Sequence, residues 1–365
     1  MSPFVIAEAG VNHDGDEGAA HALIDAAAAA GADAVKFQAF DAARLVSDRA
    51  RRAPYQRRDG QGDGQLDMLR ALELPREAHR RMAERARAAG LEYLCSAFDG
   101  ASLAFVADEL RIERLKIGSG ELDNLPFLHA HALLDRPLIL STGMGTLGEI
   151  DAALATIAHG LLRAREGGPG TERPPPTPAA LRRAYASERG GAALRERVVL
   201  LHCTTEYPAP AHEINLRALG TMARAFDLPV GYSDHSDTDV AAIAAVALGA
   251  TVVEKHLTLD RRRSGPDHAA SYDPPAFARL VRALRETATA LGSARKGPTE
   301  SELANVEHVR RSVVAARDLE AGEILDAASL DLRRPGTGLR PYRLWELIGR
   351  PSRRAYRAGE PIDPD

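Results

Sequence analysis

The chain has 365 residues, of which 45% are hydrophobic and 27% are charged, and its formal net charge is −4. This composition is typical of a globular protein and excludes a disordered or fibrous one, and the charge gives no reason to expect nucleic acid or an anionic membrane as partner. Two cysteines, Cys95 and Cys203, cannot build a disulfide framework. No signal-peptide pattern and no apolar run of about 18 residues is present, so we expect a cytoplasmic protein.

Short β-branched runs alternate with longer alanine-rich helical patterns over about the first 290 residues. The predicted strands are residues 4–10, 34–40, 91–98, 114–120, 137–143, 198–205, 229–235 and 251–259. Helical patterns include residues 19–32, 77–90, 239–250 and 275–291. This alternation is typical of βα units, and eight units predict a closed (β/α)8 TIM barrel. An open doubly wound sheet is the alternative, but no G-x-G-x-x-G motif follows the first strand.

Two stretches interrupt the alternation. Residues 163–197 contain "GGPGTERPPPTP" and predict a long, partly disordered excursion before the sixth strand. Residues 48–65 form a polar, arginine-containing loop after the second strand, on the side where active-site loops lie. This loop is either simply solvated or supplies an arginine to a phosphate or carboxylate.

The pattern changes after the eighth unit. We predict a barrel domain over residues 1–292, a linker over 293–307 and a small β-rich module over 308–365. The module has short strands and glycine-containing turns without βα alternation. A module of this size has a thin core, so it would gain stability from docking on a larger surface.

Polar side chains recur where the predicted strands end, and in a parallel barrel these ends form the mouth that holds the catalytic groups. The residues expected there are Glu8, Lys36, Gln38, Ser96, Lys116, Ser119, Glu121 and Ser141. Two lysines with hydroxyls and carboxylates suit an anionic substrate and a polyol partner, although a structural ion pair is the alternative for either lysine. We interpret Cys95 and Cys203 as small core residues.

The seventh and eighth predicted strands end in "GYSDH" and "VVEKHLTLD". Alternation places Ser233 and His235 on one face of the seventh strand, and Glu254 and His256 on one face of the eighth, with Lys255 on the other. Adjacent strands lie roughly 4.8 Å apart, so the two histidines could bind one divalent ion and leave positions open for substrate and water. A pair of hydrogen-bonded core histidines is the alternative.

Eight segments match one known family in order: "AEAGVNHDGD", "AVKFQAF", "LKIGSGEL", "STGMGTLGEI", "HCTTEYPAP", "GYSDH", "VVEKHLTLD" and "GPDHAAS". Together they resemble the sialic acid synthase family, whose members make nine-carbon nonulosonic acids, and the likeness covers nearly all of residues 4–275. The stretch "RRSVVAARDLEAGEIL" resembles that family's C-terminal antifreeze-like (SAF) domain. The resemblance therefore implies a barrel followed by a small β-rich domain, as the periodicity does independently.

The resemblance implies condensation of phosphoenolpyruvate with an open-chain N-acylated hexosamine, which gives a nine-carbon 2-keto acid and phosphate. His235 and His256 would hold a divalent metal, Mn2+ or Mg2+, that polarises the sugar aldehyde. Glu8 would stabilise the cationic centre or handle a proton. The phosphoenolpyruvate positions would be Lys36, Ser96, Lys116, Ser119 and Ser141. The positions facing the sugar or the metal's water would be Glu121, Thr205, Ser233, Asp234 and Glu254.

The family also implies a homodimer with swapped antifreeze-like domains, in which Arg311 or its neighbour Arg310 reaches the sugar in the partner's site. The "CTTEYP" form places Thr205 where neuraminate-making members carry an asparagine, and looks closer to legionaminic acid synthases. We therefore expect a 2,4-diacetamido-2,4,6-trideoxymannose acceptor. N-acetylmannosamine is the alternative, and a synthase acting on a phosphorylated sugar a more distant one. A non-catalytic, ice-interacting protein is suggested by the C-terminal module alone.

Overall fold

The structure is a computed structural model that describes residues 2–52, 64–167 and 175–363. It divides into two compact units, Met1–Gly292 and Ser293–Asp365. Within the described residues, no helix is both long enough and apolar enough to cross a bilayer.

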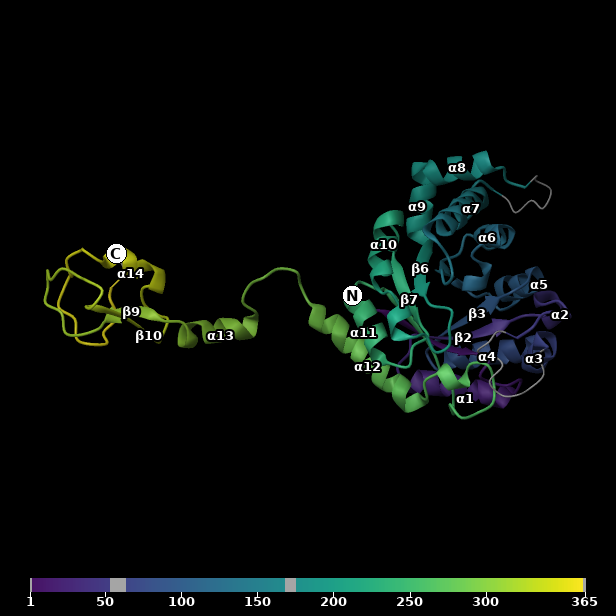
Figure 1. Cartoon of the computed structure of the whole chain (residues 1–365), viewed down its shortest axis with the longest axis horizontal. Coiled ribbons are helices and arrows are strands. Elements are labelled where there is room, and N and C mark those ends of the chain that lie inside the picture. The colour runs from purple at the N-terminus through teal and green to yellow at the C-terminus, as the bar shows by residue number, and fades with distance from the viewer. Residues whose placement is uncertain (1, 53–63, 168–174, 364–365) are drawn as a thin grey trace. The chain divides into compact units, whose positions relative to one another are not determined.

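Eight parallel strands close into a barrel in the first unit, in the order of the sequence (Figure 1). They are β1 (Phe4–Gly10), β2 (Ala34–Ala39), β3 (Glu92–Ala97), β4 (Leu115–Ile117), β5 (Leu138–Ser141), β6 (Val198–Cys203), β7 (Val230–Asp234) and β8 (Val252–His256). Parallel pairing of β8 with β1 closes the ring. The predicted (β/α)8 TIM barrel is therefore confirmed, and every observed strand lies inside its predicted range.

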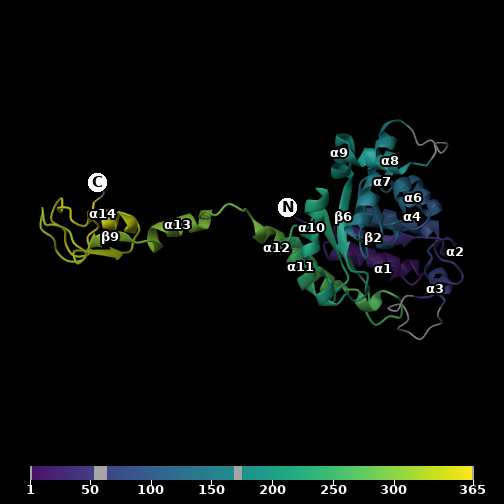
Figure 2. The same ribbon diagram turned by 45° about the horizontal axis from the view of Figure 1, so that its top comes forward.

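Helices surround the barrel on its outside (Figures 1 and 2). The α-helices are α1 (Glu17–Ala29), α2 (Ala42–Leu45), α3 (Gln65–Leu72), α4 (Arg76–Ala88), α5 (Gly100–Ala104), α6 (Leu125–Ala132), α7 (Leu147–Arg165), α8 (Pro178–Ala186), α9 (Glu188–Arg197), α10 (Arg217–Phe226), α11 (Asp239–Ala247) and α12 (Pro274–Leu291). Shorter helical turns are η2 (Phe105–Glu109), η3 (Ser119–Glu121), η4 (Ala211–Glu213) and η5 (His268–Ala270). Helices run back against parallel strands, so their N-termini lie at the same end of the barrel as the strands' carboxyl ends.

The predicted long excursion over 163–197 lies before β6 as expected, but two helices that were not predicted, α8 and α9, occupy its second half. Pro178 occupies the start of α8, where a missing N–H costs nothing, and Thr177 caps that helix. Ser187 ends α8 and accepts from Gly190 N to begin α9. Residues 168–174 lie outside the described residues. So do residues 53–63 of the polar loop after β2, with two of the five arginines on which the arginine hypothesis rests.

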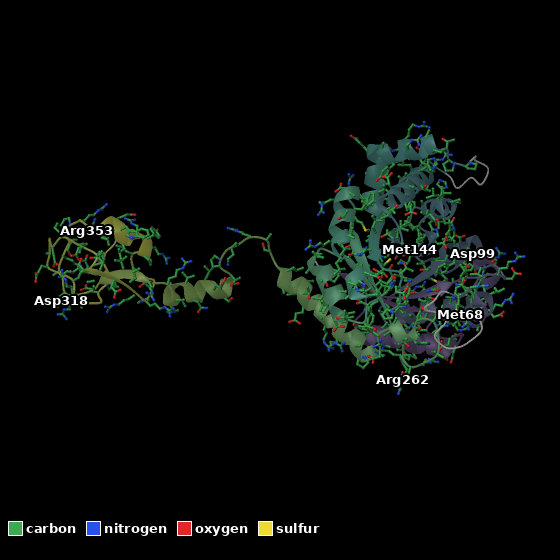
Figure 3. All side chains as sticks on the ribbon, viewed as in Figure 1. Met68, Asp99, Met144, Arg262, Asp318 and Arg353 are labelled. Carbon is green, nitrogen blue, oxygen red and sulfur yellow. The ribbon has the colours of Figure 1, made fainter. Side chains whose placement is uncertain are left out.

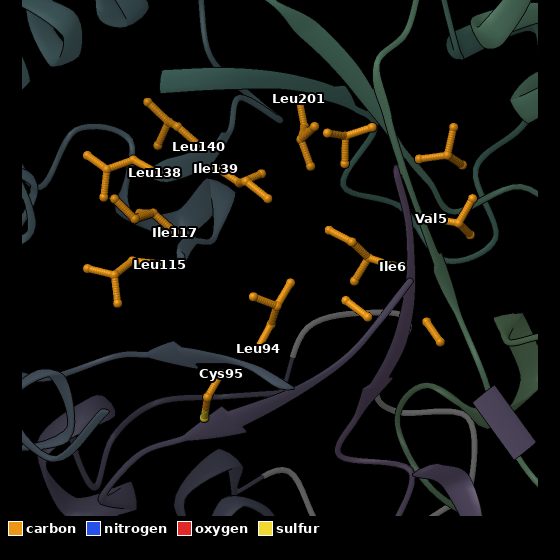
Figure 4. Packing of buried hydrophobic residues seen from close by; sticks show 14 of the residues in the cluster. Val5, Ile6, Leu94, Cys95, Leu115, Ile117, Leu138, Ile139, Leu140 and Leu201 are labelled. Carbon is orange, nitrogen blue, oxygen red and sulfur yellow. The ribbon is translucent and has the colours of Figure 1, made fainter. Parts of the chain in front are cut away.

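The barrel interior is filled by apolar side chains below the polar mouth. Ile6, Leu94, Ile139 and Leu201 point inward and pack together (Figure 4). The residue two positions further along each of these strands is Glu8, Ser96, Ser141 or Cys203. Because side chains alternate along a strand, the apolar layer and the polar ring above it share one face. The core thus sets the orientation of the site.

The second unit contains α13 (Glu300–Val309), β9 (Ser312–Ala315), β10 (Leu330–Arg333), η6 (Pro341–Arg343) and α14 (Leu344–Leu347). β9 and β10 form an antiparallel pair over a small core that includes Val313, Leu330 and Tyr356. Helix α13 begins inside the stretch 293–307 that the sequence analysis predicts as a linker. Thr299 and Glu302 form a capping box that starts the helix.

Candidate active site

The carboxyl ends of the barrel strands surround a cavity of about 280 Å³. The sequence-predicted residues that line it are Glu8, Lys36, Gln38, Ser96, Lys116, Ser119, Ser141, Thr205, Ser233, His235, Glu254 and His256. Helix α3 contributes an apolar side of the cavity with Met68, Leu69 and Leu72, and Figure 3 labels Met68 among the side chains of the barrel unit. Groups from all eight strands or the loops after them thus converge on one space.

Two lysines and two carboxylates form the floor of the cavity. Lys36 Nζ lies 2.7 Å from Glu8 Oε2 and 3.8 Å from Glu254 Oε2. Lys116 Nζ lies 3.7 Å from Glu254 Oε1. All four side chains are buried, so these charges act on one another with little screening by water.

Burial and the neighbouring ammonium groups shift the pKa values of Glu8 and Glu254 in opposite directions. Burial raises the pKa of Glu8 to about 7, against the opposing effect of Lys36. Burial would also raise the pKa of Glu254, but Lys116 and Lys36 together outweigh it and lower that pKa to about 2. Glu254 is therefore ionised at neutral pH, whereas Glu8 is able to take up or release a proton there.

Hydroxyl groups complete the ring around the lysines. Lys116 Nζ donates to Ser141 Oγ at 2.8 Å, and Lys36 Nζ lies 3.5 Å from Ser96 Oγ. Ser233 Oγ donates to Glu254 Oε1 at 3.0 Å. Ser119 Oγ accepts from the Gly143 backbone at 3.0 Å and lies 3.1 Å from Cys203 Sγ, so Cys203 is buried as expected but also forms part of the cavity wall.

The imidazoles of His235 and His256 lie side by side in the mouth, with ring centroids 5.5 Å apart. His235 Nδ1–H donates to the Thr204 carbonyl at 2.6 Å, so Nε2 carries the ring's lone pair, and Nε2 lies 3.4 Å from Ser233 Oγ. His256 Nδ1 is buried without a hydrogen-bond partner. Burial lowers the pKa of His235 to about 4, and burial together with His235 lowers the pKa of His256. Both rings are therefore neutral, the state that a metal requires.

This donor set fits a divalent cation held by two imidazoles. A backbone carbonyl that fixes the orientation of one ring is a common partner of metal-binding histidines. No group of three or more His, Cys, Asp or Glu side chains is placed to bind a metal in the part of the chain that the structure describes. The remaining coordination positions would fall to substrate and water.

Two cavity residues next to the imidazoles were not predicted from the sequence. The Tyr207 ring lies 4.2 Å from that of His235 and 5.6 Å from that of His256. Asp267 Oδ2 lies 3.7 Å from His256 Nδ1, and burial raises the pKa of Asp267 to about 6. Both lie in the quoted motifs "HCTTEYPAP" and "GPDHAAS", so the motifs marked the segments although alternation along a strand did not select these residues.

Three predicted site residues lie elsewhere. Asp234 does not line the cavity: it is on the outer face of β7 and pairs with Lys255 at 2.9 Å, because alternation turns it away from Ser233 and His235. Glu121 is not among the residues that line the cavity either, and its Oε2 accepts from Asn124 Nδ2 at the start of α6. Arg311 belongs to the second unit, where it is exposed and its Nη1 lies 3.5 Å from the Leu332 carbonyl.

Comparison with known proteins shows the family to which the chain belongs. The model of the NeuB family matches residues 23–296, and that of the SAF domain matches residues 310–365. The chain belongs to the NeuB family. The recognised resemblance to sialic acid synthases is therefore confirmed over both units.

Members of this family with assigned names match the chain over nearly its whole length. The N,N'-diacetyllegionaminic acid synthase of Campylobacter jejuni is 40% identical over 360 residues, which are 98% of this chain and 98% of that protein. The enzyme of the same name from Legionella pneumophila is 41% identical and covers 96% of this chain and 90% of its own length. Among solved structures, an N-acetylneuraminic acid synthetase from Leptospira borgpetersenii covers 84% of this chain and 91% of its own, with 28% identity and a TM-score of 0.66.

Proposed function

We propose that this NeuB-family protein is a nonulosonic acid synthase that condenses phosphoenolpyruvate with 2,4-diacetamido-2,4,6-trideoxymannose and releases phosphate. The observation that carries the proposal is the cavity itself, where two buried lysines and two buried carboxylates of unlike acidity lie below a pair of neutral imidazoles. The legionaminic type is supported by the two diacetyllegionaminic acid synthases that match nearly end to end.

The lysines and their serines form a receptor for the carboxylate and phosphate of phosphoenolpyruvate. Lys36 and Lys116 are buried, and the pKa of Lys36 is raised by the Glu254 and Glu8 carboxylates against the effect of burial. Each ammonium has a serine hydroxyl nearby, Ser96 or Ser141, and Ser119 lies on the same wall. Charge-assisted hydrogen bonds of this kind suit an anion with several oxygens.

His235 and His256 would hold a divalent metal, Mn2+ or Mg2+. Bound there, the cation would supply Lewis-acid polarisation of the sugar aldehyde. The protein's share is to keep both rings neutral, which burial favours, and to fix the orientation of the His235 ring through the Thr204 carbonyl. Tyr207 packs against the His235 ring and restricts its rotation.

The reaction needs a group that exchanges protons near neutral pH. C3 of phosphoenolpyruvate attacks the aldehyde carbon, and water adds to the cationic C2 before the bond from C2 to the phosphate oxygen breaks. The aldehyde oxygen must gain a proton and the attacking water must lose one. Glu8, with a pKa of about 7, serves both needs, while the Glu254 carboxylate stabilises positive charge at C2.

Thr205 is the residue we assign to acceptor choice. Its Oγ1 is buried at the cavity wall and has no hydrogen-bond partner within the described residues. A buried hydroxyl without a partner favours a ligand that supplies one. A second acetamido group on the acceptor offers both a donor and an acceptor. Ser233 lies on the same side of the mouth and is expected to contact the sugar or the cation's water.

We also propose a cytoplasmic homodimer in which the SAF domain caps the partner's barrel and Arg311, or Arg310, contacts the partner's sugar. Both arginines are exposed. A reducing compartment suits the two buried free thiols.

Phosphate release tests the proposed function. The enzyme would be incubated with phosphoenolpyruvate, Mn2+ and either 2,4-diacetamido-2,4,6-trideoxymannose, N-acetylmannosamine or N-acetylmannosamine 6-phosphate, and the product mass would be measured. We expect the highest kcat/KM with the diacetamido sugar. Preference for N-acetylmannosamine would make the protein a neuraminate synthase, and strict dependence on a phosphorylated acceptor would contradict the proposal.

A further inference from the structure

A buried ion pair lies directly behind the two histidines, on the outer face of the same strands. Lys255 and Asp234 are each fully buried, and their Nζ and Oδ2 atoms lie 2.9 Å apart. They are paired neighbours in the β7–β8 register. Asp234 precedes His235 in the chain, and Lys255 precedes His256. The ion pair and the imidazole pair are thus the two faces of one piece of backbone.

The ammonium of Lys255 forms hydrogen bonds to the residues on both sides of His235, Asp234 and Ser236. It donates to the side chain of Asp234 and also to the carbonyl of Ser236. Asp234 Oδ1 in turn accepts from the Ser236 N–H at 2.9 Å and from the Tyr232 hydroxyl at 3.2 Å. Asp234 and Ser236, which flank His235, are therefore both hydrogen-bonded to Lys255, which precedes His256.

The other side of the ammonium is covered by an aromatic ring. Lys255 Nζ lies 4.3 Å from the centroid of Tyr272, whose backbone N–H donates to the His256 carbonyl at 2.9 Å. The backbone of His256 is therefore also held in place: Lys255 precedes it in the chain, and the Tyr272 N–H binds its carbonyl. Free rotation of either strand end would break at least one of these contacts.

Stability alone does not explain this arrangement. A buried ion pair must overcome the cost of removing two charges from water, and well-packed apolar residues in its place are often as stable or more stable. An ion pair fixes the direction and the distance between its two charged groups, and aliphatic packing does not. Here that direction runs across the two strands that carry the imidazoles.

We infer that the Lys255–Asp234 pair is a positioning device for the metal site: it sets the separation and orientation of His235 and His256 without touching the cation or the substrates. This inference rests on the proposed metal site. Asp234, which the family resemblance assigns to the sugar side, acts here from the outer face of β7.

The test measures Mn2+ affinity of the full chain by titration calorimetry, together with the thermal midpoint Tm and the KM for phosphoenolpyruvate. Lys255→Met removes the donor but leaves Asp234 buried and unpaired, so it should lower Tm strongly. The double variant Asp234→Asn/Lys255→Met removes the unpaired charge and should recover part of that Tm. Leu128→Ala on α6 is the control, because Leu128 is fully buried far from β7 and β8 in the sequence and its truncation lowers stability by about 2–5 kcal/mol.

We expect both Lys255 variants to bind Mn2+ about 10- to 100-fold more weakly, the range typical when a partner that orients a metal ligand is removed. The KM for phosphoenolpyruvate should change less than about threefold, and the control should bind Mn2+ like the parent despite its lower Tm. Parental Mn2+ affinity in the folded double variant would overturn the inference while leaving the proposed function in place. Absence of Mn2+ binding by the parent itself would instead remove the metal site and, with it, this role.

Discussion

His268 Nε2 lies 2.9 Å from Asp14 Oδ1, so the loop after the last barrel strand is fastened to the loop after the first. Asn12 strengthens the connection by donating to the Leu257 carbonyl at 2.9 Å and to Ser271 Oγ at 2.8 Å. Asp267 lies in the segment between Leu257 and His268, and its carboxylate is next to His256. Closure of the barrel at its mouth and placement of the Asp267 carboxylate therefore depend on the same hydrogen bonds.

Asn12→Ala should lower both stability and turnover. It leaves the Leu257 carbonyl and the Ser271 hydroxyl without their donor in a buried place, which costs about 1–3 kcal/mol, and it frees the segment that carries Asp267. We expect a loss of this size in urea unfolding and at least a tenfold drop in kcat/KM. Thr177→Ala, which removes the cap of α8, should cost about 1 kcal/mol with unchanged kinetics. Parental kinetics in Asn12→Ala would show that Asp267 is held by other means.

Gly10→Ala should damage the site more than the fold. Gly10 has φ +52°, and a Cβ there would meet Glu8 Oε1 at 3.2 Å and Asp267 Oδ2 at 3.5 Å. The methyl group would push apart two carboxylates whose pKa values burial raises to about 7 and about 6. We expect kcat to fall at least tenfold, with a modest decrease in Tm.

Gly90→Ala is the matched control for this change. Gly90 has φ +78° and nothing within 4 Å of the added Cβ, so the backbone strain of about 1–2 kcal/mol is shared while the crowding is not. Equal loss of activity in both variants would show that strain, and not displacement of the carboxylates, is responsible.

Much of the site could be predicted from two facts taken together. Side chains alternate between the two faces of a strand, and the active site of a (β/α)8 barrel lies at the carboxyl ends of its strands. Lys36, Lys116, His235 and His256 each lie on the inner face at a strand's carboxyl end, and the cavity collects them. The family resemblance assigns Asp234 to the sugar side, whereas alternation along β7 places it on the outer face, where it pairs with Lys255.

The residues that escaped prediction come from loops. Tyr207 and Asp267 enter the cavity from segments beyond β6 and β8. These loops follow neither the strand period of two residues nor the helix period of 3.6, because long-range hydrogen bonds decide their backbone path. The helices α8 and α9 were missed for a different reason. Proline and glycine near their starts read as interruptions, although Pro178 begins α8 without loss of a hydrogen bond.

Thr205→Asn should shift the acceptor preference. Thr205 Oγ1 is a buried, unpartnered group at the cavity wall, and the longer amide would fill space that we assign to the second acetamido group. We expect kcat/KM for the diacetamido sugar to fall at least tenfold relative to that for N-acetylmannosamine, with the KM for phosphoenolpyruvate unchanged. Thr205→Ser keeps the hydroxyl and should retain the parental ratio. An unchanged ratio in Thr205→Asn would place the choice of sugar elsewhere.

His79 should make the fold sensitive to acid. It is buried between α4 and β3, its Nδ1 lies 2.9 Å from the Tyr93 hydroxyl, and burial lowers its pKa to about 4. The unfolded chain therefore binds the proton more tightly, so His79 contributes stability that is fully present above about pH 6.5 and is lost as the pH falls toward about 4. A shift of this size corresponds to on the order of 3 kcal/mol.

His79→Gln keeps a hydrogen-bonding group near Tyr93 but cannot titrate. We expect the free energy of unfolding of the parent, measured in urea from pH 7 to pH 4, to fall more steeply than that of the variant. The difference in slope should be concentrated between pH 6.5 and pH 4. His13 and His131, whose pKa values burial also lowers to about 4, will keep an acid-dependent slope in both proteins. Parallel curves for parent and variant over that interval would mean that His79 is protonated as readily in the folded protein as in the unfolded chain, contrary to its burial.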